Sequence, residues 1–175
     1  YLVSQDQTIR SRMKKWISLL ILSAFACTGG YTFTGGDVGD AKTISVANFP
    51  NYAELFQPNL SLTLTEAIRD IFVQQTRLEL TSRDGDLQLE GEITDYRVEP
   101  VNAQANATVA QNRLTIKVKV RFTNTLDDTK DYDKQFSRYR DFDASQNLAA
   151  VEETLSEEIN QELAENILNA AIANW

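Results

Sequence analysis

Hydrophobic and polar residues alternate most regularly over residues 113–124, RLTIKVKVRFTN. Aliphatic and aromatic residues take every second position from 114 to 122, and basic residues or threonine take the positions between them. Successive side chains of a β-strand point to opposite faces of the sheet. The pattern therefore predicts a strand with one buried face and one face in water.

The segment 86–98 alternates in a similar way but changes phase once. Its apolar residues take odd positions at first and even positions from Tyr96 onward. A one-residue change of phase implies a β-bulge, which we place near Thr94 and Asp95. Pro100 is expected to end this strand, because proline cannot donate to a neighbouring strand.

Two less regular segments are also predicted to be strands. Residues 42–49 are rich in β-branched residues, and Pro50 follows them. Residues 131–140 come directly after an aspartate-rich turn at 127–130 and return alongside the strand before it. The chain is thus expected to contribute four strands to one sheet.

A first helix is indicated by apolar residues that recur every three or four positions after residues 57–59. Pro58 suits the first turn of a helix, and Thr63 and Glu66 have the spacing of a capping box. The helix is expected to end near residues 75–78.

The second helix is the strongest helical pattern in the chain, with apolar residues from Leu148 to Ala170. Ser145 or Asp143 is expected to cap it. Its outer face is acidic, and no lysine or arginine follows Arg140. This acidity is either solvated or opposed by a basic partner surface. The glutamates are Glu152, Glu153, Glu157, Glu158, Glu162 and Glu165.

The order of these elements predicts the fold class. One strand, one helix, three strands and a final helix pack most economically as an α+β two-layer sandwich. We expect a four-stranded, mostly antiparallel sheet with two helices on one face. Residues 42–175 should form this single domain.

The region before the domain is typical of a bacterial secretory signal. Two lysines precede an apolar run at 16–26, and small residues lead to Cys27. A membrane-spanning helix needs about 20 apolar residues, more than this run supplies. We therefore divide the chain into an upstream segment and signal peptide at 1–26, a mature start at Cys27, and a glycine-rich tether at 27–41.

Cys27 leaves two alternatives open. It lies where a bacterial lipoprotein carries its acyl chains, so lipid attachment to Cys27 would anchor the protein. The sequence Ala-Phe-Ala at 24–26 also fits an ordinary cleavage site, which would release it. The tether after Cys27 either packs through its two aromatic residues or acts as a flexible linker.

Composition excludes several kinds of chemistry. The chain has no histidine and one cysteine, so Ser-His-Asp triads, Cys-His pairs and histidine-cysteine zinc sites are excluded. Residues 27–175 carry 13 basic and 24 acidic side chains, a net charge of −11, which disfavours nucleic acid as a partner. No catalytic residue, metal or cofactor is predicted. A hydrolase built on two carboxylates is disfavoured because the acids lie on turns and on an exposed helix face.

Two charged features of the sequence resemble binding sites. Asp84, Gly85 and Asp86 are too few for a calcium loop and are predicted to form a turn. The basic residues of 113–124 and of the strand after it form a local positive band on an acidic protein. The band is either a solvated face with cross-strand charge pairs or a patch for an anionic ligand.

Short motifs along the chain resemble one known family. None of them is catalytic, so the resemblance rests on their number and order. They are Cys27, GYTFTG at 30–35, NFPN at 48–51, QP at 57–58, TEA at 65–67, GDL at 85–87, EGEI at 90–93, NRLT at 112–115, FSRY at 136–139 and ANW at 173–175. The whole segment from Cys27 onward resembles the lipopolysaccharide-assembly lipoprotein family, LptE.

The resemblance implies a role at the outer membrane. Members of this family are lipoproteins on the periplasmic side, anchored by acyl chains such as palmitate. They insert into the lumen of a large β-barrel, LptD, as plug and assembly partner, and help deliver lipopolysaccharide to the surface. The implied partners are an LptD-type barrel, lipopolysaccharide and the membrane.

Candidate contacts with lipopolysaccharide or the barrel are the residues of the positive band, Arg113, Lys117, Lys119, Arg121 and Arg138. The alternative function is a periplasmic lipoprotein that binds an anionic glycolipid through this band without a barrel partner. The acidity of the domain favours the plug over the lipid binder.

Overall fold

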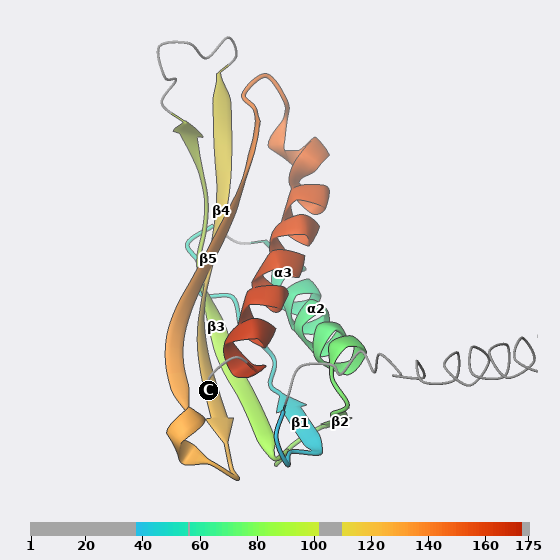
Figure 1. Ribbon diagram of the computed structural model, residues 1–175. Coiled ribbons are helices and arrows are strands. Elements are labelled where there is room, and N and C mark those ends of the chain that lie inside the picture. The colour runs from blue at the N-terminus through green and yellow to red at the C-terminus, as the bar shows by residue number, and fades with distance from the viewer. Residues whose placement is uncertain (1–37, 56, 102–109, 173–175) are drawn as a thin grey trace, which may run out of the picture. The chain divides into compact units, whose positions relative to one another are not determined.

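The computed structural model describes residues 38–55, 57–101 and 110–172 (Figure 1). The predicted signal peptide at 1–26, Cys27 and most of the tether at 27–41 lie outside these residues. The described elements, in chain order, are β1 Thr43–Val46, α2 Leu60–Gln75, β2 Glu79–Thr81, β3 Leu87–Val101, β4 Gln111–Asn124, the 3₁₀ turn η1 Asp128–Lys130, β5 Tyr132–Asp143 and α3 Leu148–Ile172.

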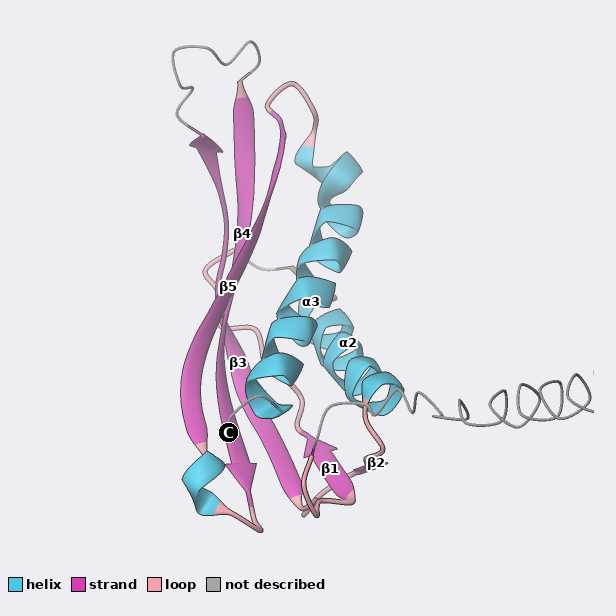
Figure 2. Cartoon of the chain, viewed as in Figure 1, coloured by secondary structure: helices cyan, strands magenta, loops and turns pink. Residues whose placement is uncertain are grey.

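The α+β class and the two helices on one face of a sheet are confirmed (Figure 2). The prediction of four mostly antiparallel strands is wrong in detail. The sheet has five strands in the order β2-β1-β3-β4-β5. β3, β4 and β5 are antiparallel neighbours, whereas β1 is parallel to both β2 and β3. A parallel pair needs a crossover connection, which α2 supplies after β1.

β2 was missed because it is only three residues long, too short for an alternating pattern. β1 is shorter than predicted. The residues after it still run beside β3 but make only isolated hydrogen bonds to it. The N–H of Ala47 donates to Leu89, and Ile93 exchanges hydrogen bonds with Pro50 and Tyr52.

β3 runs through Pro100 rather than ending there, and Pro100 lies opposite Asn112 of β4. β1 pairs with β3 only up to Leu89, so the far half of β3 is a sheet edge on that side. Proline is tolerated at such an edge because its missing N–H is not needed by a neighbouring strand.

The predicted bulge is confirmed. The register between β3 and β4 shifts between Ile93 and Asp95, which leaves Thr94 as the extra residue. Ile93 and Tyr96 are both buried, on either side of the shift. Thr94 is tied in place by its hydroxyl, which donates to the carbonyl of Lys117.

α2 opens after residues 57–59 as predicted, but the capping box is wrong. The side-chain oxygen of Gln57 accepts from the N–H groups of Asn59 and Leu60, at 2.7 and 2.9 Å. Thr63 lies inside the helix, where its hydroxyl donates to the carbonyl of Asn59.

α3 likewise begins at Leu148 without a cap from Ser145 or Asp143. Asn147 accepts from the N–H of Ala149, the second residue of α3, at 3.1 Å. Asp143 instead accepts from the N–H of Ser145 in the preceding turn.

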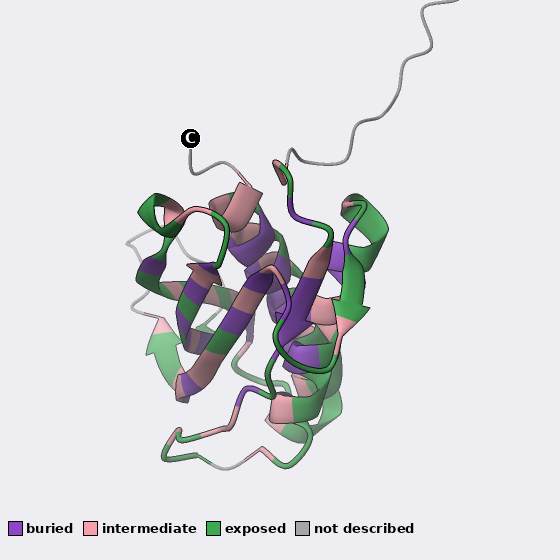
Figure 3. Ribbon diagram, turned by 90° about the horizontal axis from the view of Figure 1, so that it is seen from below, coloured by how far each residue is buried: buried purple, intermediate pink, exposed green. Residues whose placement is uncertain are grey.

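The core lies between the sheet and the two helices, where the buried residues gather (Figure 3). Every predicted inward residue of β4 is at most 1% exposed. They are Leu114, Ile116, Val118, Val120 and Phe122. α2 contributes Leu64, Ile68 and Phe72 to the same core, and α3 contributes Ile159, Leu163 and Ile167.

Replacing Gly91 with alanine should lower the free energy of unfolding by about 1–3 kcal/mol. A Cβ at this position would lie 2.4 Å from the carbonyl oxygen of Lys119 and 2.4 Å from a ring carbon of Phe49. The backbone of β4 would have to move to admit the methyl group. Urea unfolding checks the change, with Glu90→Ala at the exposed neighbouring position as the control. Equal stability of the two variants would contradict the close approach.

Candidate interaction surfaces

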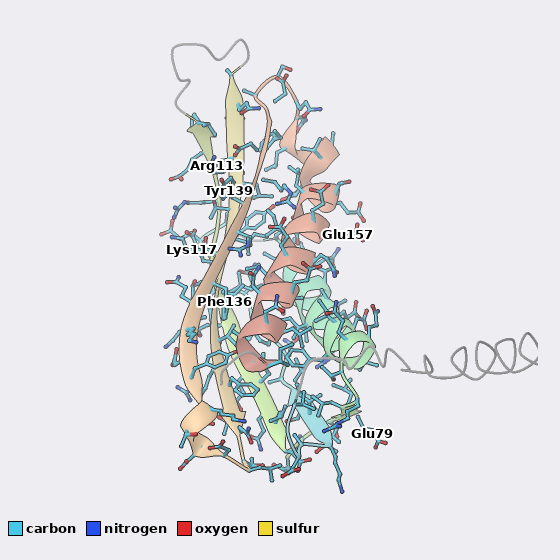
Figure 4. The ribbon with its side chains drawn as sticks, viewed as in Figure 1. Glu79, Arg113, Lys117, Phe136, Tyr139 and Glu157 are labelled. Carbon is cyan, nitrogen blue, oxygen red and sulfur yellow. The ribbon has the colours of Figure 1, made fainter. Side chains whose placement is uncertain are left out.

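The outer face of the sheet, which neither helix covers, carries the basic row of β4. Four of the five predicted contact residues lie on this row, and Figure 4 labels Arg113 and Lys117 among them. Directly opposite residues of neighbouring strands lie on the same face. Each cation of the row faces an acid on β3. The pairs are Arg113 with Glu99, Lys117 with Asp95, Lys119 with Glu92, and Arg121 with Glu90.

Ion pairs link the basic row to acids on both neighbouring strands. Lys117 lies 3.2 Å from a carboxylate oxygen of Asp95 on β3. On β5, Asp133 lies 3.4 Å from Lys119 and 3.8 Å from Arg121. The outer face therefore carries a mosaic of positive and negative charges rather than a positive band. This agrees with the predicted alternative of a solvated face with cross-strand charge pairs.

Arg113 is held most firmly. Its guanidinium makes two hydrogen bonds to the carboxylate of Asp141, at 2.7 and 2.9 Å, and lies 3.7 Å above the ring of Tyr139. The hydrogen bond with Asp141 raises the pKa of Arg113 and lowers the pKa of Asp141. A planar guanidinium suits both contacts, which a lysine could not reproduce.

Arg138 does not lie with the other four. It faces Ile116 of β4 across the ladder, so it lies on the side of the sheet that the helices cover. Its guanidinium donates to Asn166 of α3 at 2.6 Å and lies 3.6 Å from Glu162. The predicted contact residues thus divide into a group of four and one residue that joins β5 to α3.

The family of the chain follows from comparison with known proteins. A family model described as "Lipopolysaccharide-assembly", LptE, matches residues 41–171. The chain belongs to this family. The resemblance found in the sequence motifs is thereby confirmed. No curated protein sequence matches the chain.

Solved structures share the fold of this LptE-family domain at low sequence identity. A minor lipoprotein from Acinetobacter baumannii is 13% identical with a TM-score of 0.52, covering 77% of this chain and 94% of that one. A protein from Xanthomonas campestris is 9% identical with a TM-score of 0.52, covering 77% and 85%. A hypothetical protein from Chlamydia trachomatis is 11% identical with a TM-score of 0.51, covering 76% and 99%.

The sequence analysis did not identify the contact of Arg140 with α3 of the LptE-family domain, where Arg140 makes two ion pairs and Arg138 makes one. Its guanidinium reaches Glu158 at 2.7 Å and Glu162 at 2.6 Å. These hydrogen bonds, Glu162 first, raise the pKa of Arg140, and Arg140 lowers the pKa of Glu162. The signal was present, because Arg138 and Arg140 share the parity of inward Phe142 and the two glutamates are four residues apart.

The Asp84 to Asp86 segment, predicted to form a turn, lies in the loop between β2 and β3 of the LptE-family domain. One carboxylate oxygen of Asp86 accepts from the N–H groups of Lys42 and Thr43, at 2.9 and 3.0 Å. These backbone hydrogen bonds lower the pKa of Asp86. The carboxylate is therefore occupied in fixing the start of β1.

Two properties of the described residues concern metals and membranes. Histidine, cysteine, aspartate and glutamate form no group there that could hold a metal ion. Among the helices of those residues, none has the length and apolar content needed to cross a bilayer.

Proposed function

We propose that this LptE-family protein is an outer-membrane lipoprotein that plugs and assembles the lipopolysaccharide translocon β-barrel, of the LptD type. It takes part in lipopolysaccharide transport to the cell surface and catalyses no reaction. Cys27 would carry the acyl chains, on the periplasmic side of the membrane.

The observation that carries this proposal, beside the family, is the mosaic of charge on the outer face. A plug must put a large polar surface against a polar, water-filled lumen. On the outer face each cation of the basic row lies opposite an acid, so the charges compensate one another. Such a face can lie against the lumen wall without burying a large unpaired charge.

The length of the central strands also supports the role. β3 has 15 residues and β4 has 14. At 3.2–3.4 Å per residue such strands are about 45–50 Å long. The apolar band of an outer-membrane barrel is about 25 Å tall. A hairpin of this length is long enough to extend along the lumen over the full height of that band.

The alternative, a glycolipid binder without a barrel, receives less support. An anionic headgroup would have to compete with Asp95, Asp133 and Asp141 for the same cations. The basic row could still touch lipopolysaccharide at its rim, but it does not offer an uncompensated positive patch.

Purification from detergent-solubilised outer membranes tests the proposal. An affinity tag after Trp175 should recover an outer-membrane β-barrel in about equal amount, identified by its mass. The same tag on an unrelated outer-membrane lipoprotein serves as the control. Recovery of the tagged protein without a barrel would count against the plug.

The anchor has its own prediction. Cys27→Ser should move newly made protein from the membrane fraction to the soluble fraction in cells depleted of the barrel, because each buried CH₂ of an acyl chain contributes about 0.8 kcal/mol. Depleting the barrel is necessary because binding to the barrel would also keep the protein in the membrane fraction. Wild-type protein in the same cells should stay with the membrane. If wild-type and variant distribute alike, Cys27 is not the anchor.

A further inference from the structure

A groove of about 650 Å³ runs between α2 and α3. Its walls are one face of α2, from Asn59 to Gln74, and the first half of α3, from Ala149 to Gln161. Figure 4 labels Glu157 on α3, pointing away from the sheet. A cleft of this volume is within the usual size range of ligand sites, about 300–1,000 Å³. It is separate from the outer face of the sheet.

The charge of this α2–α3 groove is of one sign. Five carboxylates line it and no lysine or arginine does; the acids are Glu66, Asp70, Glu152, Glu153 and Glu157. The only cations that reach α3 among the described residues, Arg138 and Arg140, pair with Glu158 and Glu162 instead. The five acids of the groove wall take no part in these pairs.

A second observation concerns Asn160, which lines the groove and is only 2% exposed. Its amide nitrogen donates to the hydroxyl of Thr63 at 3.0 Å. That hydroxyl donates to the carbonyl of Asn59 and accepts from Asn160. The side-chain oxygen of Asn160 is then left without a donor among the described residues.

The carboxylates of the groove and the oxygen of Asn160 are acceptors, whereas the hydroxyl of Ser156, also buried without a partner among the described residues, can donate or accept. The one phenolic donor nearby, the hydroxyl of Tyr96, is used by Glu152. A buried acceptor without a donor is unfavourable, so an occupant that brings an N–H group to Asn160 is favoured by that hydrogen bond as well as by the charge attraction. Guanidinium and ammonium groups supply both, since they are cationic and donate without accepting.

We propose that the α2–α3 groove receives a lysine- or arginine-bearing segment of the barrel partner. This inference rests on the proposed function, because a barrel must be present to supply the segment. It deepens that function by assigning the two sides of the domain different roles. The compensated outer face lies against the lumen wall, and the acidic groove provides the charge-specific contact.

The test compares two triple variants that change net charge equally. The groove variant is Glu66→Gln, Glu153→Gln and Glu157→Gln. The control is Glu54→Gln, Glu79→Gln and Glu165→Gln, three exposed acids that do not line the groove. All six side chains are exposed, so both variants should fold, which circular dichroism checks.

The groove variant should bind the barrel roughly tenfold more weakly than wild type, as expected for the loss of several exposed charge contacts. The control should match wild type. The difference should shrink as salt is raised, because exposed charges are screened. A photo-reactive residue in place of Glu157 should cross-link to a barrel peptide that contains lysine or arginine.

Three results would overturn the proposal while leaving the plug intact. These are equal barrel binding by wild type and the groove variant, equal weakening by both variants, and a cross-link to lipid or to a barrel peptide without a cation. The second result would mean that binding follows net charge alone. If wild type recovers no barrel, the proposed function and this inference both fail.

Discussion

Replacing Phe72 with alanine should lower the free energy of unfolding by about 3–5 kcal/mol. Phe72 is fully buried, on the face of α2 that packs against the sheet. Removing its ring loses the apolar burial and leaves a cavity that the rigid sheet cannot fill by moving. For a domain of this size such a loss is a large part of total stability.

Urea unfolding followed by circular dichroism measures this change. The midpoint should fall while the slope with urea stays constant. Val73→Ala at the next position is the control, because Val73 is 49% exposed and its removal should matter little. A loss below about 1 kcal/mol for Phe72→Ala would mean that α2 does not pack on the sheet as described.

Raising the pH above about 10 should destabilise the domain through two buried tyrosines. Burial, with a hydrogen bond to Glu152, raises the pKa of Tyr96, and burial raises the pKa of Tyr132. The unfolded chain therefore loses these protons first. The contribution of each tyrosine is complete below its unfolded pKa and falls by about 1.4 kcal/mol per pH unit above it.

Urea unfolding at a series of alkaline pH values tests this behaviour. Tyr96→Phe and Tyr132→Phe should each flatten the decline of stability with pH. Tyr139→Phe is the control, because Tyr139 is 49% exposed. An unchanged slope in both of the first two variants would show that other groups govern the alkaline transition.

The parts of the fold that the sequence predicted are those with long periodic patterns. In β4 and in both helices, the apolar spacing repeats several times. The bulge in β3 was predictable because the alternation is regular on both sides of it. β2 could not be found in this way, because Glu79–Thr81 offers no repeat and pairs only through its parallel neighbour β1. The parallel arrangement of β1 depends on the path of α2 over the sheet, which local pattern does not encode.

The contact surfaces were only partly predictable for a related reason. Basic residues on β4 were visible in the sequence, but their neutralisation depends on the register with β3 and β5, which sets Lys117 beside Asp95. Arg138 was grouped with them by its charge, although its place in the alternation of β5 puts it on the helix side. The α2–α3 groove required knowing which faces of two distant helices meet.

The extra residue in β3, Thr94, affects the bending of the strand but not which of its side chains are buried. Without Thr94, Ile93 and Tyr96 would be two positions apart and would still point the same way. The inside and the outside of β3 therefore do not depend on Thr94. What the insertion adds is local bending and twist. Relatives of this chain could consequently gain or lose a residue here and alter the curvature of the long hairpin while keeping the same buried side chains.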